Sequence, residues 1–373
     1  MSQTAPAPSI DGPTSALPYR IPPLYSPGSL GRHPAGDRIA RRLREGLDAE
    51  GVLDDPGYLM TYEGQDLAEM VACFSPTAGI DDLVEVGSVF AIGMMADNPQ
   101  TGDAHRPILH HHLTGGSPTI DPRAVAERVV DPEISDAVPD VLSQAFLRAL
   151  RRLPGVEGND KRGLMIESFL TWFRAEVRVE RLETGGREPG LEEAVGNRLE
   201  TMGELLIAAV VLPLFPSVTT GHVRHPEVLR IESLITLVLS AHNELYSGYS
   251  DLASGSKSNW VRIFAREAGG TLQQGAERVA ELADRAYAEA RRSTDALAAR
   301  GHDESVVAFL EAQLSILANA LEWWYPRQMA VRYRVPGLDL SHACPTLTSR
   351  PQAVGAPGIG CLDHLWSQDR QPA

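Results

Sequence analysis

Apolar residues recur at helical spacing along most of this chain, within segments that are rich in Leu, Ala, Glu and Arg. This composition favours α-helices, whereas strands would show β-branched residues alternating with polar ones. We therefore predict an all-α fold with a large apolar core. The predicted helices span residues 35–50, 64–74, 79–97, 121–131, 138–153, 162–181, 190–212, 225–252, 257–268, 270–300 and 304–326.

The two ends of the chain have a different composition. Residues 1–25 carry many prolines among small polar residues. Such a segment buries too little apolar area to offset the entropy of ordering, so we predict a disordered Pro-rich leader. The folded domain is predicted over 26–336. The tail at 337–373 is rich in Pro, Gly and Ser and is predicted to be irregular.

Charge and apolar run length exclude several kinds of partner. With 49 acidic and 34 basic residues the net charge is −15, which argues against nucleic acid, because phosphate binding requires clustered Lys and Arg. The longest apolar run, Leu205 to Leu212, ends at Pro213 and is too short to span a bilayer. The three cysteines lack CxxC spacing, and no signal peptide precedes the domain. We therefore expect a cytoplasmic protein without a membrane span.

Candidate metal ligands occur in the helix predicted at 225–252. Asn243, Ser247 and Asp251 recur at every fourth position, which places them on one helical face. An amide oxygen, a hydroxyl and a carboxylate suit a hard cation such as Mg²⁺. The preceding turns are apolar all round, as in a buried helix. On spacing alone, a fraying helix end without a ligand is an equally good interpretation.

This pattern resembles the second metal motif of class I terpene synthases, in its bacterial form. Two further landmarks resemble this family at close to its separations. The segment 189–203 is similar to the part that senses diphosphate, which implies that Arg198 binds diphosphate. It further implies that Thr201 is the linker and that the backbone carbonyl of Met202 helps to trigger ionisation. The pair Arg332-Tyr333 resembles the pair that closes the active site on the diphosphate.

The resemblance is closest to the 2-methylisoborneol synthase group, which shares the Pro-rich leader and the segment from residue 22 to 52. It implies a helical bundle around a central cavity and a helix-packed homodimer. Some relatives with such leaders resemble cargo proteins of encapsulin-like shells, so the leader would dock there.

The first metal motif of the family is degenerate in this chain. Gly93 and Met94 stand at the usual aspartate pair, or Ile92 and Gly93 if the longer spacing of the 2-methylisoborneol group applies. Of the acids, Asp97 alone remains. Because Mg²⁺ prefers oxygen ligands, the ion on the Asn243 side should bind best and the other ions poorly, unless Asp97 or Asp103 substitutes for the missing acids.

Ser250 stands where the family often has a lysine before the final acid of the second motif. Lys257 is the candidate that would compensate and contact the substrate. The histidines His105 and His110–His112 could hold a transition metal, but an exposed run without function is favoured. Several aromatic residues either line a cavity and stabilise carbocations or are plain core. These are Phe169, Trp172, Phe173, Phe215, Trp323, Trp324 and Tyr325.

The resemblance implies an enzyme that ionises a prenyl diphosphate with Mg²⁺ and cyclises the carbocation in an apolar cavity. Two alternatives remain open on the sequence. One is a weakened or non-catalytic protein that binds prenyl diphosphate, because the aspartate pair is missing. The other is an interaction protein that docks through its leader.

Overall fold

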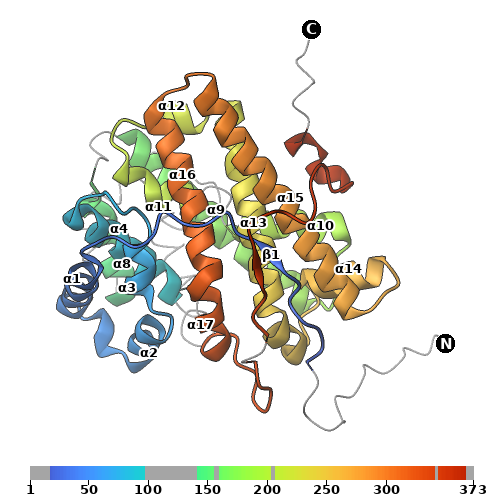
Figure 1. Ribbon diagram of the computed structural model, residues 1–373. Helices are drawn as coiled ribbons and strands as arrows, with labels where there is room; N and C mark the ends of the chain where they lie inside the picture. Colours follow the sequence, from blue (N-terminus) through green and yellow to red (C-terminus); the bar gives the residue numbers. More distant parts are fainter. Residues whose placement is uncertain (1–16, 97–140, 155–158, 203–205, 341–342, 367–373) are drawn as a thin grey trace.

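The computed structural model describes residues 17–96, 141–154, 159–202, 206–340 and 343–366 (Figure 1). Within these ranges nearly all regular structure is helical, which confirms the predicted all-α class. The helix predicted at 121–131 and the histidines His105 and His110–His112 lie outside the described residues.

Short helices and one long helix make up the first half of the fold. They are α1 (Gly36–Ala49), η1 (Val52–Asp54), α2 (Pro56–Gly64), α3 (Leu67–Ala72), α4 (Ile80–Ala96), α8 (Val141–Arg152), α9 (Asn159–Thr184), α10 (Leu191–Thr201), α11 (Leu206–Val211), η2 (Leu212–Leu214) and α12 (Thr220–Val223). The predicted helix 190–212 is therefore divided, and α10 ends beside the point where the chain leaves the described range at 203–205.

Longer helices dominate the second half. They are α13 (Pro226–Ser254), α14 (Trp260–Glu267), α15 (Leu272–Ala299), α16 (Glu304–Asn319), the π-helical turn η3 (Ala320–Trp324) and α17 (Tyr325–Ala330), followed by η4 (Gly360–Leu365). Two short strands, β1 (Leu24–Tyr25) and β2 (Leu347–Thr348), pair in parallel.

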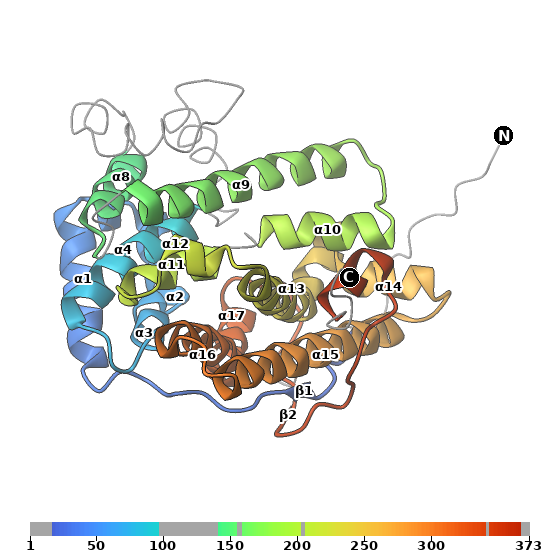
Figure 2. The same ribbon diagram turned by 90° about the horizontal axis from the view of Figure 1, so that it is seen from above.

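Helix α13 lies in the middle of the bundle, with α9 and α10 on one side and α15 and α16 on the other (Figure 2). Its 29 residues begin at Pro226, whose fixed φ suits the first helical position. They end before Gly255, which has a φ of 81°, the left-handed conformation that glycine adopts without strain. Most of its side chains are buried, as the apolar sequence of its first half predicts.

A π-helical turn interrupts the predicted helix 304–326. Pro326 lacks an amide N–H, and its ring would clash with a carbonyl one turn earlier in a regular α-helix. The chain widens into η3 immediately before this proline, and α17 then continues to Ala330. The wider turn carries Trp324 and is followed by Tyr325, and both side chains contribute to the cavity described below.

The structure differs from the predicted domain boundaries at both ends. Residues 17–25 pack on the bundle, with Tyr19 and Leu24 buried, instead of belonging to a disordered leader. The tail predicted to be irregular supplies β2 and the buried residues Leu362 and Leu365. The sequence does not predict these contacts, because they depend on a few isolated apolar residues that form no periodic pattern. Such residues are buried once the helices provide a surface on which they can pack.

The segment Glu304–Ala330 is long and apolar enough to cross a membrane by length and composition alone. In this structure 72% of its most apolar window is buried inside the bundle. Its apolar character is therefore accounted for by the core of the fold.

A buried carboxyl group joins α13 to α16. Glu232 is 1% exposed, and its Oε1 accepts a hydrogen bond of 2.7 Å from Nε2 of Gln313. Burial raises the pKa of Glu232 from 4.5 to about 8, and the Gln313 hydrogen bond offsets only part of this effect. The carboxyl group is therefore protonated in the folded protein at neutral pH.

This raised pKa makes stability depend on pH. Between pH 4.5 and 8 the folded state binds more protons at Glu232 than the unfolded state does. The contribution of Glu232 to the free energy of unfolding therefore falls as the pH rises through this range. Glu232→Gln, which keeps an acceptor oxygen, should match the wild type near pH 4.5. At pH 8.5 the variant should be more stable by a few kcal/mol, since one pKa unit is worth about 1.4 kcal/mol. Urea unfolding at pH 4.5 and pH 8.5 measures the difference in the free energy of unfolding between the variant and the wild type. The same difference at both pH values would contradict the prediction.

Candidate active site

A cavity of about 560 Å³ opens beside the middle and the end of α13. Polar side chains from α10, α13 and the segment after α17 line one part of it, and aromatic and aliphatic side chains line the rest. The apolar lining comes from Met70, Phe74, Phe90, Met94, Phe169, Trp172, Val179, Ile207, Val210, Val211, Leu239, Ile316, Trp324 and Tyr325. Such a division suits a ligand with one charged end and one hydrocarbon end.

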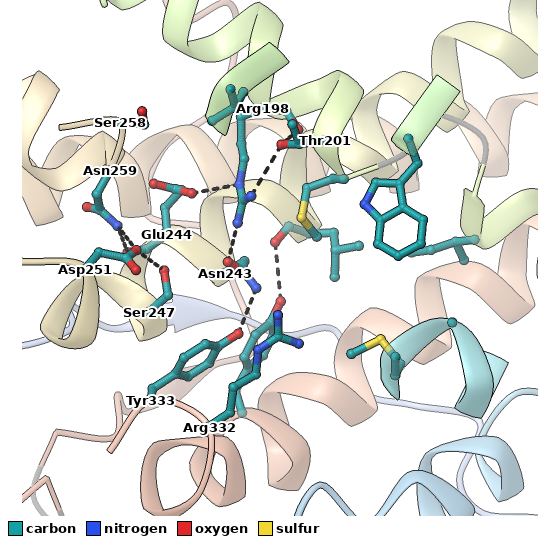
Figure 3. A pocket seen from close by; sticks show the side chains of 18 of the residues that line it. Arg198, Thr201, Asn243, Glu244, Ser247, Asp251, Ser258, Asn259, Arg332 and Tyr333 are labelled. Carbon is teal, nitrogen blue, oxygen red and sulfur yellow. Dashed lines mark hydrogen bonds and ion pairs between the residues drawn. The ribbon is translucent and has the colours of Figure 1, made fainter. Parts of the chain in front are cut away.

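The predicted metal row faces this cavity. Asn243, Ser247 and Asp251 all belong to its lining, on the last turns of α13 (Figure 3). The hydroxyl group of Ser247 donates a hydrogen bond of 2.6 Å to Oδ2 of Asp251. The same carboxylate oxygen accepts a bond of 2.9 Å from Nδ2 of Asn259. The four-residue spacing therefore places amide, hydroxyl and carboxylate oxygens on one face of α13, at a single polar wall, as the sequence predicts.

Arg198 reaches this row from the neighbouring helix α10 and belongs to the same polar wall (Figure 3). Its guanidinium group donates to Oδ1 of Asn243, and its Nε lies 2.7 Å from Oε1 of Glu244. A weaker contact of 3.3 Å joins the guanidinium group to the hydroxyl of Thr201. The planar fork of arginine allows these contacts at once, and it can also bind phosphate oxygens bidentately.

Glu244 connects this arginine to α14. The residue is 4% exposed, and its Oε2 accepts a hydrogen bond of 2.7 Å from the backbone N–H of Trp260, the first residue of α14. The indole N–H of Trp260 in turn donates to the carbonyl oxygen of Ala194 on α10, at 3.3 Å. A carboxylate at a helix N-terminus is favoured by the helix dipole. These contacts fix α10 and α13 relative to each other, and with them the position of Arg198.

Arg332 and Tyr333 complete the polar wall from the other side. Tyr333 is 4% exposed, and its hydroxyl accepts a hydrogen bond of 2.9 Å from Nδ2 of Asn243. The guanidinium carbon of Arg332 lies 5.8 Å from the centre of the Tyr333 ring, within the range of a cation–π contact. Asn243 is therefore held between Arg198 and Tyr333, as Figure 3 shows.

The end of α4 lies at the apolar part of the cavity. Phe90, Gly93 and Met94 are in the lining, so the turn that the resemblance assigns to the aspartate pair does face the cavity. A Cβ atom at Gly93 would lie 3.5 Å from the ring of Phe169, which is an ordinary van der Waals contact. Hydrogen and thioether groups at 93 and 94 offer no oxygen ligand. Asp97 and Asp103 lie outside the described residues.

The other predicted site residues have mixed outcomes. Thr201 and Met202 line the cavity at the end of α10. Lys257 is not among the described lining residues, because its Nζ is directed to the carbonyl oxygen of Gly186 at 2.7 Å. Of the aromatic candidates, four line the cavity and two, Phe215 and Trp323, pack outside it. The four are Phe169, Trp172, Trp324 and Tyr325. The side chain of Phe173 is not described.

The donor set on α13 fits Mg²⁺. Asn243, Ser247 and Asp251 offer the hard oxygen atoms that this ion prefers, at a wall that opens to the cavity. In the described part of the chain, no three His, Cys, Asp or Glu side chains converge on a metal position, so the candidate ligands include the amide of Asn243 and the hydroxyl of Ser247. The fit therefore covers the α13 side of the cavity.

Sequence reasoning missed Glu244 and Asn259. Glu244 could have been recognised from the sequence, because an acidic residue in a helix predicted to be buried requires a partner. Asn259 could also have been recognised, because asparagine is typical of the position that begins a helix. Its side chain caps α14 by accepting a hydrogen bond of 3.0 Å from the N–H of Val261. Its second role, the bond to Asp251, depends on how α13 and α14 pack and has no signal in the local sequence.

Comparisons with known proteins bear on the fold and on part of the sequence. Residues 122–289 match the sequence family described as Terpene synthase family 2, C-terminal metal binding. Among solved structures, the chain is similar to the SVS_A2 protein from ancestral sequence reconstruction, with a TM-score of 0.71 and 18% identity over 93% of this chain and 99% of that chain.

Two named enzymes show the same likeness. Hedycaryol synthase in complex with nerolidol has a TM-score of 0.63 and 16% identity, over 82% of this chain and 100% of that chain. Linalool/nerolidol synthase from Streptomyces clavuligerus, in complex with 2-fluorogeranyl diphosphate, has a TM-score of 0.62 and 16% identity, over 79% and 100%. This chain therefore has the all-α fold of class I terpene synthases, with terpene synthase family 2 homology over residues 122–289.

Proposed function

We propose that this protein is a terpene synthase that ionises a prenyl diphosphate with the help of Mg²⁺ and cyclises the resulting carbocation. One observation carries the proposal: Arg198, Asn243 and Tyr333 converge at the polar wall of a cavity that is otherwise apolar. The diphosphate would lie at this wall, and the hydrocarbon chain would lie against the aromatic lining.

The residues of the polar wall would have separate roles in ionisation. Arg198 and Arg332 would bind the diphosphate oxygens, and Tyr333 would donate a hydrogen bond to them. Asn243, Ser247 and Asp251 would hold Mg²⁺, which as a Lewis acid would neutralise charge on the leaving group. The carbon–oxygen bond of the substrate breaks, and its electron pair leaves with the diphosphate. The positive charges at the wall favour this step because they stabilise the departing anion.

The apolar lining would control the carbocation. A double bond of the same chain supplies the electrons for ring closure, and the reaction ends when a proton is lost or water adds. Ring faces of Phe169, Trp172 and Tyr325 would stabilise positive charge through their π-electrons. The protein's contribution at this stage is the shape of the cavity and the exclusion of water.

A specific observation favours a second candidate function, a protein that binds prenyl diphosphate with weak or no turnover. The α4 side of the cavity presents Gly93 and Met94, where oxygen ligands would help to bind further ions. Incubation with geranyl, 2-methylgeranyl, farnesyl and geranylgeranyl diphosphates plus Mg²⁺ separates the two candidates. Terpene products detected by mass spectrometry support the synthase, whereas saturable binding without diphosphate release supports the binder.

Replacing Asn243 tests the metal row. Asn243→Ala removes an oxygen ligand and the anchor of Arg198 and Tyr333, so Mg²⁺-dependent diphosphate release should fall by about 100-fold or more. Asn243→Asp keeps an oxygen ligand and should retain more activity than Asn243→Ala. Circular dichroism should show the same helix content in both variants. Equal rates in the wild type and Asn243→Ala would contradict the assignment.

Restoring acids on α4 tests the other wall. The double variant Gly93→Asp, Met94→Asp should lower the Mg²⁺ concentration needed for half-maximal diphosphate release, because it adds carboxylate ligands that face the cavity. Gly93→Asn, Met94→Asn has similar shape without charge and serves as its control. Without Mg²⁺ the acidic variant should melt at a lower temperature than the control, since uncompensated carboxylates repel each other and resist desolvation.

Mg²⁺ plus pyrophosphate should then restore the melting temperature of the acidic variant more than that of the control. Destabilisation that persists with both ligands would show instead that the end of α4 is closed core.

A further inference from the structure

The chain segment before β1 is joined to the metal-binding turns of α13 by a tyrosine. Tyr19 is 2% exposed, and its hydroxyl donates a hydrogen bond of 2.6 Å to the carbonyl oxygen of Leu245. In return, the hydroxyl of Tyr249 donates to the carbonyl oxygen of Tyr19 at 3.1 Å. The two rings stack, with centroids 4.5 Å apart and an angle of 11° between their planes. Segment and helix are thus joined by two hydrogen bonds and a ring contact.

A glycine on α13 makes this approach possible. A Cβ atom at Gly248 would lie 2.2 Å from Oη of Tyr19, which is too close for any real contact. Glycine inside a helix is less stable than alanine by about 1 kcal/mol, so it needs a local reason. The hydroxyl of Tyr19 occupies the space that a side chain at 248 would fill, which accounts for the glycine.

These contacts lie on the same turns as the metal row. Ser247 is adjacent to Gly248, and Asp251 follows one turn later, on the side that faces the cavity. Asn259 holds Asp251 on the cavity side, whereas Tyr19 holds the backbone of these turns through Leu245. The end of α13 is therefore fixed on both sides.

The protonation state of Tyr19 suits a donor. Burial raises the pKa of Tyr19 well above its usual value, and the nearby Tyr249, Asp251 and Glu244 act in the same direction. The phenol is therefore protonated at neutral pH and can donate its hydrogen bond to Leu245.

We propose that Tyr19 is a positioning residue for the metal site, which holds the turns of α13 that carry Ser247 and Asp251 in the geometry that binds Mg²⁺ with diphosphate. The inference rests on the proposed function, because that function assigns the metal to this row. It makes the segment 17–25 part of the active-site framework.

The first test compares two tyrosines of the same segment. Tyr25 packs edge-on against Tyr287, with ring centroids 5.4 Å apart, and its backbone N–H donates to Asp284 on α15, so it does not act through α13. Tyr19→Phe and Tyr25→Phe each remove one hydroxyl. The probe is inorganic pyrophosphate at fixed concentration, titrated with Mg²⁺, and the readout is the Mg²⁺ concentration that gives half of the rise in melting temperature.

Tyr19→Phe should raise this Mg²⁺ concentration by about fivefold, which corresponds to one hydrogen bond of about 1 kcal/mol. Tyr25→Phe should leave it unchanged. A purely structural role for Tyr19 would lower the melting temperature without ligand and leave the Mg²⁺ midpoint at the wild-type value, and that result would overturn the proposal.

The second test is a double-mutant cycle between Tyr19 and Gly248. Gly248→Ala should raise the Mg²⁺ midpoint in the wild type, because the new methyl group displaces the Tyr19 hydroxyl. In the Tyr19→Phe background the same change should have a smaller effect, since the nearest atom of residue 19 is then Cζ at 3.2 Å. Additive effects of the two changes would overturn the proposed contact.

Failure of this inference differs from failure of the proposed function. Pyrophosphate binding that depends on Tyr19, in a protein that turns over no prenyl diphosphate, would overturn the function and leave the positioning role. Turnover of a prenyl diphosphate together with a Mg²⁺ midpoint that Tyr19→Phe leaves unchanged would support the function and overturn the positioning role. A wild type that binds no pyrophosphate with Mg²⁺ would overturn both.

Discussion

The ion pair between Arg198 and Glu244 is the interaction on which the arrangement of the site depends. Nε of Arg198 lies 2.7 Å from Oε1 of Glu244, which is itself almost fully buried. Leaving the buried Glu244 carboxylate without its arginine would cost several kcal/mol, so Glu244 requires Arg198. The pair fixes α10 against α13, and the N-terminus of α14 stabilises the same carboxylate through Trp260. Arg198 is thereby held at the wall of the cavity with part of its guanidinium group directed at Asn243.

Spacing within one helix was the most informative part of the sequence. The row of Asn243, Ser247 and Asp251 could be placed on one face because helical periodicity alone determines that face. The resemblance supplied Arg198 and Tyr333, and the structure brings both to Asn243. The extent of α13 was also predictable, because apolar residues at helical spacing predicted a helix over 225–252 and the structure has one over Pro226–Ser254.

Contacts between distant segments were the part that sequence did not show. Tyr19 looks like part of a Pro-rich leader, yet it stacks on Tyr249 because the folded helices offer a surface for it. Gly248 has meaning only once Tyr19 is in place. Lys257 was expected to contact the substrate, but its ammonium group bonds to Gly186. In each case the partner is far away along the chain, and no local pattern encodes such pairing.

The two facing walls of the cavity, on α13 and α4, differ in chemistry. Oxygen ligands gather on α13, while Gly93 and Met94 present hydrocarbon and thioether surface from α4. We infer that the α13 wall provides a metal position, whereas the described end of α4 brings no side-chain oxygen to the cavity. Crystals soaked with Mn²⁺ and pyrophosphate, measured at the manganese absorption edge, test it most directly. We expect an anomalous peak within coordination distance of Asn243, Ser247 and Asp251, with pyrophosphate next to Arg198. Pyrophosphate bound without a peak at these residues, or manganese bound only elsewhere, would contradict it.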